Sequence, residues 1–264
     1  GLPHPHNLRA GFGCEAAVRE AGAPPATVAV IAGELRVGLT AGELESLAGS
    51  GARKVSAREL GGTMAHGADG ATTVAATVRA ASLAGIRFMA TGGIGGVHRG
   101  RPEDQSADLE EMARSPVAVF CAGAKSILDL GLTRERLESL SVPLIGFGCD
   151  EMPAFYTRRS GIWTDARAES AEEVARILAA AWETGSRGVV IAIPPPEELP
   201  GAEAIIAQAV TETASVRGPE ATPRVLARIA EISQGRSVTV NVSLVINNAG
   251  VAARAALAFS RLGG

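Results

Sequence analysis

Short apolar runs rich in valine and isoleucine alternate along the chain with amphipathic segments of helical period, and this alternation restricts the fold more than any other feature. The runs lack a regular exchange of apolar and polar residues, which is typical of parallel strands buried on both faces. We expect strands in five of these runs, residues 27–32, 86–91, 117–121, 142–147 and 188–193. Three of the intervening helices begin with capping boxes, formed by Thr40 with Glu43, Ser56 with Glu59 and Ser170 with Glu173.

Two regions depart from this alternation. A turn around Gly33 within residues 28–39 predicts a hairpin, which would make the sheet mixed. From Gly201 onward the pattern is almost wholly helical, with segments near 201–215, 222–234 and 242–260, and Thr222-Pro223 puts proline at a first helical position. No linker-like composition divides the chain. We therefore predict one α/β domain over residues 1–264, with a mixed, largely parallel central sheet flanked by helices (α/β/α) and a helical C-terminal layer.

The net charge and the cysteines indicate which binding partners and which cellular compartment to expect. The net charge is −3 and aromatic residues make up 3% of the chain, so neither a basic excess nor stacking residues favour nucleic-acid binding. The three cysteines are odd in number and lack a CxxC pair, which argues against a disulfide framework or a structural zinc site. We expect a cytoplasmic protein with unpaired cysteines. They are Cys14, Cys121 and Cys149.

The longest uncharged stretch, residues 237–253, carries Asn241, Asn247, Asn248 and two serines. This polarity argues against a membrane span of about 20 apolar residues. Asparagine is a poor helix former, so its presence among valine, leucine and isoleucine suggests either a ligand site or a buried hydrogen-bond network. Hydrogen bonding between helices is a sufficient alternative explanation.

Three loops follow predicted strand ends, where parallel α/β sheets bind their ligands. They are Thr91-Gly-Gly-Ile-Gly-Gly-Val-His-Arg-Gly100, Cys121-Ala-Gly-Ala-Lys125 and Ala192-Ile-Pro-Pro-Pro196. In the first loop, Gly92, Gly93, Gly95 and Gly96 let the backbone approach an anion, and His98 and Arg99 can donate hydrogen bonds to a phosphate. The spacing is not that of a dinucleotide-binding motif, because His98 stands where the third glycine would fall. A tight connection with a surface His-Arg pair is the alternative.

Lys125 lies behind an apolar strand, among small residues, where we expect a helix to begin. A Walker A motif is disfavoured because Ala124 and Val119 replace its two glycines. Burial and the positive end of a helix dipole both disfavour the ammonium form, and a neutral amine is the nucleophile of Schiff-base chemistry. The alternative is a lysine whose head group extends to solvent.

Carboxylates and a basic pair complete the candidate set. Glu103, Asp104 and Asp108 surround Ser106 at the start of a predicted helix. Carboxylates in such a place cap the helix, or with waters they bind Mg²⁺ or Mn²⁺. Lys54 lies with Arg53 before the helix that Ser56 caps, where most basic pairs are solvated.

Seven segments together resemble the pseudouridine-5′-phosphate glycosidase family, also called the indigoidine synthase A-like family, over essentially the whole chain. They are Pro25-Ala-Thr-Val-Ala-Val30, Gly70-Ala-Thr-Thr-Val-Ala75, Thr91-Gly-Gly-Ile-Gly-Gly-Val-His-Arg-Gly100, Ser106-Ala-Asp-Leu109, Cys121-Ala-Gly-Ala-Lys-Ser-Ile-Leu-Asp-Leu-Gly131, Pro153-Ala-Phe155 and Thr222-Pro223.

The resemblance implies an enzyme that reversibly cleaves the carbon-carbon glycosidic bond of pseudouridine 5′-phosphate to uracil and ribose 5-phosphate. It implies a divalent metal, usually Mn²⁺, and a homotrimer. An ordinary glycosidase uses two carboxylates because oxygen leaves, whereas here carbon must leave and a lysine adduct at ribose carbon 1 offers an electron sink. By resemblance, the roles are Lys125 as Schiff-base nucleophile, Lys54 as second active-site lysine, Asp104 as metal-associated aspartate, Val74 and Ser106-Ala107-Asp108 as substrate contacts, and Asn241 as active-site asparagine.

Two departures from the family pattern concern the metal and the proton donor. The family's Asp-Ile-Ser-Ala-Asp is Asp104-Gln105-Ser-Ala-Asp108 here, after a slightly shorter loop. The family's proton-donor glutamate lies in a Glu-Ser-Thr segment just before the position of Gly1, so we expect either that the chain begins inside a longer protein or that a shortened chain is impaired. Two rival functions are a Schiff-base aldolase or lyase acting on another sugar phosphate, and a non-catalytic sugar-phosphate binding protein.

Overall fold

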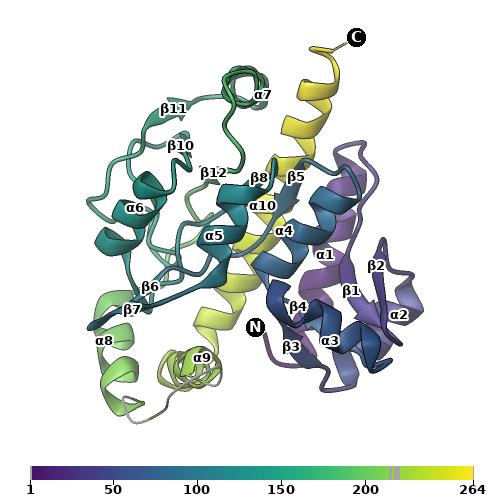
Figure 1. The fold of residues 1–264 in the computed structure, drawn as a ribbon. Helices are drawn as coiled ribbons and strands as arrows, with labels where there is room; N and C mark the ends of the chain where they lie inside the picture. The colour runs from purple at the N-terminus through teal and green to yellow at the C-terminus, as the bar shows by residue number, and fades with distance from the viewer. Residues whose placement is uncertain (1, 214–215, 217–220, 264) are drawn as a thin grey trace.

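A five-stranded parallel sheet forms the centre of the computed structural model, which describes residues 2–213, 216 and 221–263 (Figure 1). Its spatial order is β11-β10-β12-β8-β5, and every neighbouring pair is parallel. The strands are β5 (Phe88–Ala90), β8 (Ala118–Cys121), β10 (Leu144–Phe147), β11 (Ala166–Ala168) and β12 (Val189–Ala192). Four of the five predicted runs form strands of this sheet.

Helices cover both faces of the sheet, as predicted. In β8, Val119 and Cys121 belong to the apolar cluster on one face, and Ala118 and Phe120 belong to the cluster on the other. The first face carries α4 (Val74–Leu83), α5 (Ala107–Arg114) and α6 (Leu130–Ser139), and the second carries α7 (Ala171–Glu183) and the C-terminal half of α10 (Arg236–Ser260). Because successive strand residues point to opposite faces, a run that is apolar throughout needs this double cover.

The predicted hairpin is confirmed, but it belongs to a second sheet. This sheet has the order β2-β1-β4-β3, in which β1 pairs antiparallel with β2 and β4, while β3 and β4 are parallel. The mixed pairing is therefore confined to it, and the central sheet is parallel. Its elements are β1 (Val28–Ile31), β2 (Glu34–Val37), β3 (Arg53–Val55) and β4 (Gly70–Thr72), with α2 (Ala41–Gly49), η1 (Ala57–Glu59) and α3 (Leu60–Ala65) between them.

A third, small antiparallel sheet lies where the sequence predicted a loop and the start of a helix. Its order is β7-β6-β9, formed by β7 (Arg101–Gln105), β6 (Val97–His98) and β9 (Leu128–Asp129). Strands of two residues are too short to show a period, so the sequence pattern could not predict them. This sheet joins the segment after Lys125 to the strand that carries His98.

The C-terminal region is helical, as predicted, with α8 (Ala202–Glu212), α9 (Ala221–Ile232) and the long α10. The predicted first segment runs into residues 214–215, which lie outside the described residues. Pro223 is the third residue of α9, still in the first turn, where a backbone N–H has no intrahelical acceptor. By length and composition α10 could cross a membrane, but 56% of its apolar window is buried and it packs against α1 (His6–Glu20), α7, β5 and β8, as a core helix does.

Candidate active site

The loops after β5 and β8 run side by side beyond the ends of their strands. Four backbone hydrogen bonds continue the parallel pairing: Thr91 N–H to Phe120 at 2.9 Å, Ala122 to Gly92 at 2.9 Å, Ile94 to Gly123 at 3.1 Å and Lys125 to Ile94 at 3.0 Å. The glycine-rich loop and Lys125 are therefore neighbours at the carboxyl edge of the sheet, where ligands are expected.

Lys125 is not at a helix start, contrary to the expectation from sequence. The chain makes a turn and enters β9, and α6 begins only at Leu130 with Asp129 as its N-cap. The helix dipole therefore does not act directly on this amine. Burial lowers the pKa of Lys125, the positive charge of Lys54 acts in the same direction, and the carboxylate of Asp108 opposes them. The shift toward a neutral amine is as predicted, but its main cause is burial.

Asp108 joins two parts of the site through its carboxylate. It is buried, with Oδ1 accepting the backbone N–H of Ala75 at 2.8 Å and Oδ2 accepting that of Gly95 at 2.7 Å. Its own N–H donates to the hydroxyl of Ser106, the N-cap of α5, at 3.2 Å. Val74 and Ala107, the first residues of α4 and α5, lie at the same junction, so the predicted substrate-contacting residues come together here.

The glycines of the loop make room for the protein's own side chains. A Cβ on Gly93 would lie 2.6 Å from the ring of Phe155, and one on Gly96 would lie 2.3 Å from the Thr133 hydroxyl. On Gly95, it would lie 2.1 Å from the Ser106 hydroxyl. We expected these glycines to expose the backbone to an anion, but in the structure close packing already requires them.

His98 and Arg99 are neighbours in sequence with different surroundings. Burial lowers the pKa of the half-buried His98. Positive charge at Arg101, Lys125 and Lys54 acts in the same direction, and the carboxylate of Asp104 acts against it. Arg99 instead donates two hydrogen bonds to backbone carbonyls of the segment after Lys125. The phosphate contact predicted for both residues stays a prediction.

Lys54 and Asn241 reach the site from distant parts of the chain. Lys54 lies on β3, and its charge acts on both Lys125 and His98. Asn241 lies on α10, with its Oδ1 3.1 Å from the position that a Cβ on Gly92 would take. Seven residues farther along α10, the buried Asn248 donates its side-chain amide to the carbonyl of Thr91 at 2.8 Å.

Asp104, the predicted metal residue, lies on β7 and forms an ion pair with Arg101 at 3.0 Å. Among the described residues, no group of three or more His, Cys, Asp or Glu side chains is arranged to hold a metal ion. A cation at Asp104 would therefore take most of its ligands from water or substrate, a mode that Mg²⁺ tolerates with a single carboxylate. The residues do not by themselves form a metal cage.

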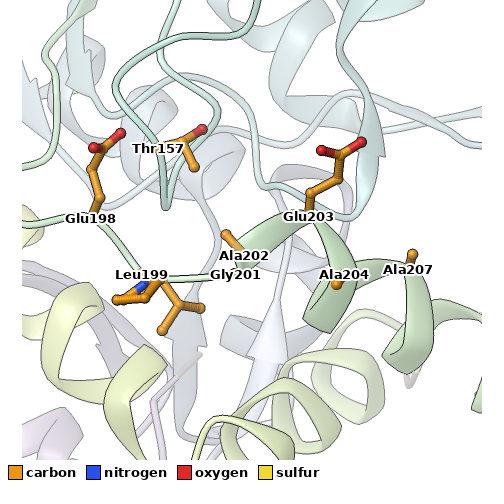
Figure 2. A pocket seen from close by; sticks show the side chains of 9 residues that line it. Thr157, Glu198, Leu199, Gly201, Ala202, Glu203, Ala204 and Ala207 are labelled. Carbon is orange, nitrogen blue, oxygen red and sulfur yellow. The ribbon is translucent and has the colours of Figure 1, made fainter.

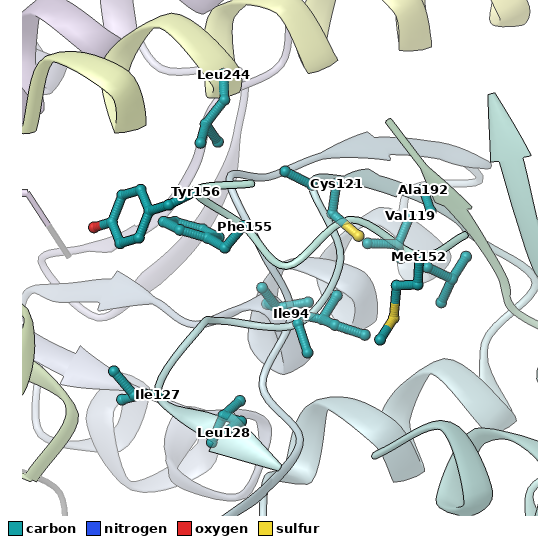
Figure 3. Close-up of a cluster of buried hydrophobic side chains, with 14 of the residues drawn as sticks. Ile94, Val119, Cys121, Ile127, Leu128, Met152, Phe155, Tyr156, Ala192 and Leu244 are labelled. Carbon is teal, nitrogen blue, oxygen red and sulfur yellow. The ribbon is translucent and has the colours of Figure 1, made fainter. Parts of the chain in front are cut away.

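Phe155 is a site residue that the sequence reasoning missed. Its φ of 67° is in the left-handed region, its ring is buried, and its N–H donates to the carbonyl of Ala122 at 3.0 Å. Figure 3 shows Phe155 and Tyr156 side by side in the apolar cluster that also holds Ile94 and Ile127. The segment Pro153-Ala154-Phe155 resembles the family and could have drawn attention to Phe155. The left-handed φ of this residue, however, cannot be predicted from the sequence.

A separate hollow lies elsewhere on the described surface. It has a volume of about 840 Å³ and is lined by Thr157 and the residues at the start of α8, with Glu198 and Glu203 on either side of Ala202 (Figure 2). None of the predicted site residues lines it. The hollow therefore does not change the assignment of the site to the loops around Lys125.

Comparison with known proteins identifies the family. The sequence model of the indigoidine synthase A-like proteins matches residues 1–258. This chain belongs to the indigoidine synthase A-like family. Relatives in this family include the pseudouridine-5′-phosphate glycosidases of Nocardioides sp., Clostridium botulinum and Escherichia coli, at 50%, 46% and 47% identity. The alignments cover 99%, 99% and 100% of this chain and 89%, 89% and 88% of those proteins.

Solved structures of the indigoidine synthase A-like family have the same fold. An indigoidine synthase A-like protein from Thermotoga maritima is 35% identical, with a TM-score of 0.91 over 99% of this chain and 89% of that one. A prealnumycin C-glycosynthase in complex with ribulose 5-phosphate is 36% identical, with a TM-score of 0.88 over 96% and 87%. The parallel sheet with its long C-terminal helix is therefore the fold of this family.

Proposed function

We propose that this protein is a pseudouridine-5′-phosphate glycosidase, which reversibly cleaves the substrate to uracil and ribose 5-phosphate through a lysine-ribose imine. The observation that carries the proposal is the partly buried Lys125, whose pKa burial lowers, at the carboxyl edge of a parallel sheet, in a chain about half identical to glycosidases of that name. Burial favours the neutral amine, and only the neutral amine attacks carbon.

In the proposed reaction the Lys125 nitrogen forms a bond to ribose carbon 1, while the bond from that carbon to the ring oxygen breaks and the oxygen takes a proton. The nitrogen lone pair then forms the imine as the carbon-carbon bond breaks, and the uracil carbon takes up a proton. Water hydrolyses the imine, which supplies the aldehyde oxygen of ribose 5-phosphate and restores the amine. Substrate and one water thus give the two products.

The remaining residues bind and orient the substrate in this proposal. Lys54, close enough to act on both Lys125 and His98, would attract the phosphate and keep Lys125 neutral. The Ser106–Asp108 turn and Val74 would line the substrate, and Asn241 would hydrogen-bond to it from α10. No described residue is assigned to the protonation of uracil.

We further propose that Mn²⁺ or another divalent cation binds at Asp104, with waters completing its coordination. A homotrimer and a cytoplasmic location also belong to the proposal, from the family resemblance and from the unpaired cysteines of the described chain. The metal can be tested by dialysis against EDTA and readdition of Mn²⁺, and the assembly by light scattering. Asp104→Asn should raise the Mn²⁺ concentration needed for half-maximal activity.

Release of free uracil from pseudouridine 5′-phosphate in the presence of Mn²⁺, followed by chromatography, tests the function. We expect turnover by the wild type and none by Lys125→Arg, whose guanidinium stays protonated. Borohydride should trap ribose 5-phosphate on Lys125, identified by peptide mass. Ribose 5-phosphate binding without trapping or uracil release would instead support the sugar-phosphate binding protein.

A second candidate is the synthesis of a C-glycoside from a pentose phosphate and an aromatic compound other than uracil. It is favoured by the similarity to the prealnumycin C-glycosynthase, which at 36% identity is more distant than the glycosidases. Borohydride trapping on Lys125 without uracil release would support this candidate or an aldolase.

A further inference from the structure

Arg99 forms two hydrogen bonds with the backbone that follows Lys125. Its Nε donates to the carbonyl of Leu128 at 3.0 Å, and one of its terminal nitrogens donates to the carbonyl of Ser126 at 2.9 Å. Ser126 is the residue next to Lys125, and Leu128 opens β9. One guanidinium therefore spans the turn between the lysine and the small antiparallel sheet.

The small sheet explains why Arg99 reaches this turn. His98 pairs with Leu128 across β6 and β9, and Gly100 after Arg99 has a φ of 68°, which turns the chain back into β7. Arg99 lies in the turn that follows β6, and its guanidinium is directed to the carbonyls of Ser126 and Leu128. The surroundings of His98 differ, because the charges of Lys125, Lys54 and Asp104 act on it.

The turn is also held by the pairing of β6 with β9 and by the Lys125 N–H, which donates to the Ile94 carbonyl at 3.0 Å. The N–H of Leu128 donates to the Lys125 carbonyl at 3.0 Å and closes the turn, while the buried hydroxyl of Ser126 has no hydrogen-bond partner among the described residues. The Ser126 carbonyl accepts a hydrogen bond from the Arg99 side chain. A rigid nucleophile needs such support, since a misplacement of about 1 Å can cost about 100-fold in rate.

We propose that Arg99 is a positioning residue, which clamps the turn after Lys125 and fixes the direction of its amine toward the sugar. The proposal rests on the proposed function for its kinetic consequence, but the clamp itself is a property of the free protein. Arginine is required because its planar guanidinium donates to two carbonyls at once, whereas lysine has a single ammonium group on a flexible side chain. A phosphate-binding residue, by contrast, would retain much of its effect as lysine.

The experiment compares Arg99→Lys and Arg99→Met with the wild type and with Arg114→Met. Arg114 is exposed and forms a surface ion pair with Glu110, so its variant controls for the loss of one positive charge. The rate of borohydride trapping at saturating ribose 5-phosphate, and kcat and KM for uracil release, are measured for each. Hydrogen exchange of the Leu128 amide is measured without substrate, and circular dichroism checks folding.

We expect both Arg99 variants to lose about tenfold or more in trapping rate and kcat, with KM changed less than about twofold, and Leu128 to exchange faster in both. Arg114→Met should match the wild type. A rise in KM alone, or wild-type kinetics in Arg99→Lys, would overturn the clamp and favour a phosphate contact. Unchanged exchange at Leu128 in both variants would also overturn it. If the wild type neither traps ribose 5-phosphate nor releases uracil, the proposed function fails, while the exchange experiment still decides on the clamp.

Discussion

Asp108 accepts the backbone N–H of Gly95 at 2.7 Å, and this contact fixes the glycine-rich loop to the start of α5. The same carboxylate accepts the N–H of Ala75 at the start of α4. This carboxylate lies close enough to Lys125 to oppose the lowering of the lysine pKa by burial. The loop, two helices and the nucleophile are thus coupled through one side chain.

Gly95→Ala should disrupt this junction. Its Cβ would lie 2.1 Å from the Ser106 hydroxyl and 2.7 Å from Asp108 Oδ2, so the loop or the start of α5 must move. Overpacking of this kind costs about 1–3 kcal/mol, and we expect a lower melting temperature and a loss of uracil release. Gly61→Ala in α3 is the matched control, since its Cβ meets nothing within 4 Å and alanine favours a helix. Normal activity in Gly95→Ala would contradict the close packing.

Lys125→Met should abolish turnover and stabilise the fold at neutral pH. Burial holds the pKa of Lys125 below 10.5 in the folded protein, so between the folded and unfolded pKa values the unfolded chain binds more protons. The destabilising effect of this lysine is therefore greatest below the folded pKa and disappears as the pH rises toward 10.5. Methionine has no such penalty. Thermal unfolding across this range should show an advantage for the variant that shrinks with rising pH, and an advantage that grows would contradict the assignment.

The two asparagines of α10 should separate binding from stability. Asn241 is partly buried beside Gly92, whereas Asn248 is fully buried and donates to the Thr91 carbonyl. We expect Asn241→Ala to impair uracil release with a melting temperature near that of the wild type. Asn248→Ala leaves that carbonyl without its side-chain donor, which costs about 1–3 kcal/mol. Equal losses of stability in both variants, measured in urea, would show that Asn241 is only structural.

The central sheet could be predicted because its strands carry their own signal, and the small sheet could not. The run 117–121 is apolar throughout, which requires cover on both faces, and β8 has that cover. Val97 and His98 form the central strand of the small sheet because β7 pairs with them on one side and β9 on the other, and the pairing with β9 is a tertiary contact. For the same reason the predicted helix start at Lys125 was wrong, since the segment that follows it joins β9 before α6 begins.

The candidate site was also predictable only in part from the sequence. The residue types at Lys125 and at the glycine-rich loop indicated a ligand-binding edge, and the structure brings the two loops together. Whether His98 and Arg99 act together depends on the direction of each side chain, one at the end of β6 and the other in the turn after it, and their adjacency in sequence does not show these directions. The nearness of Lys54 to Lys125 also required the fold, because β3 belongs to a different sheet.

Phe155 and Gly93 should be energetically coupled. Phe155 holds a φ of 67°, a conformation that costs about 1–3 kcal/mol for a residue other than glycine, and its ring fills the space beside Gly93. Gly93→Ala places a methyl group 2.6 Å from this ring and should destabilise the protein. Phe155→Leu removes the ring edge, so the double variant should be more stable than the sum of the single effects predicts, by about 1 kcal/mol or more. Phe259→Leu, in the cluster on the opposite face, is the control and should combine additively with Gly93→Ala. Additivity in the Phe155 pair as well, measured by urea unfolding, would mean that the ring does not hold the glycine-rich loop.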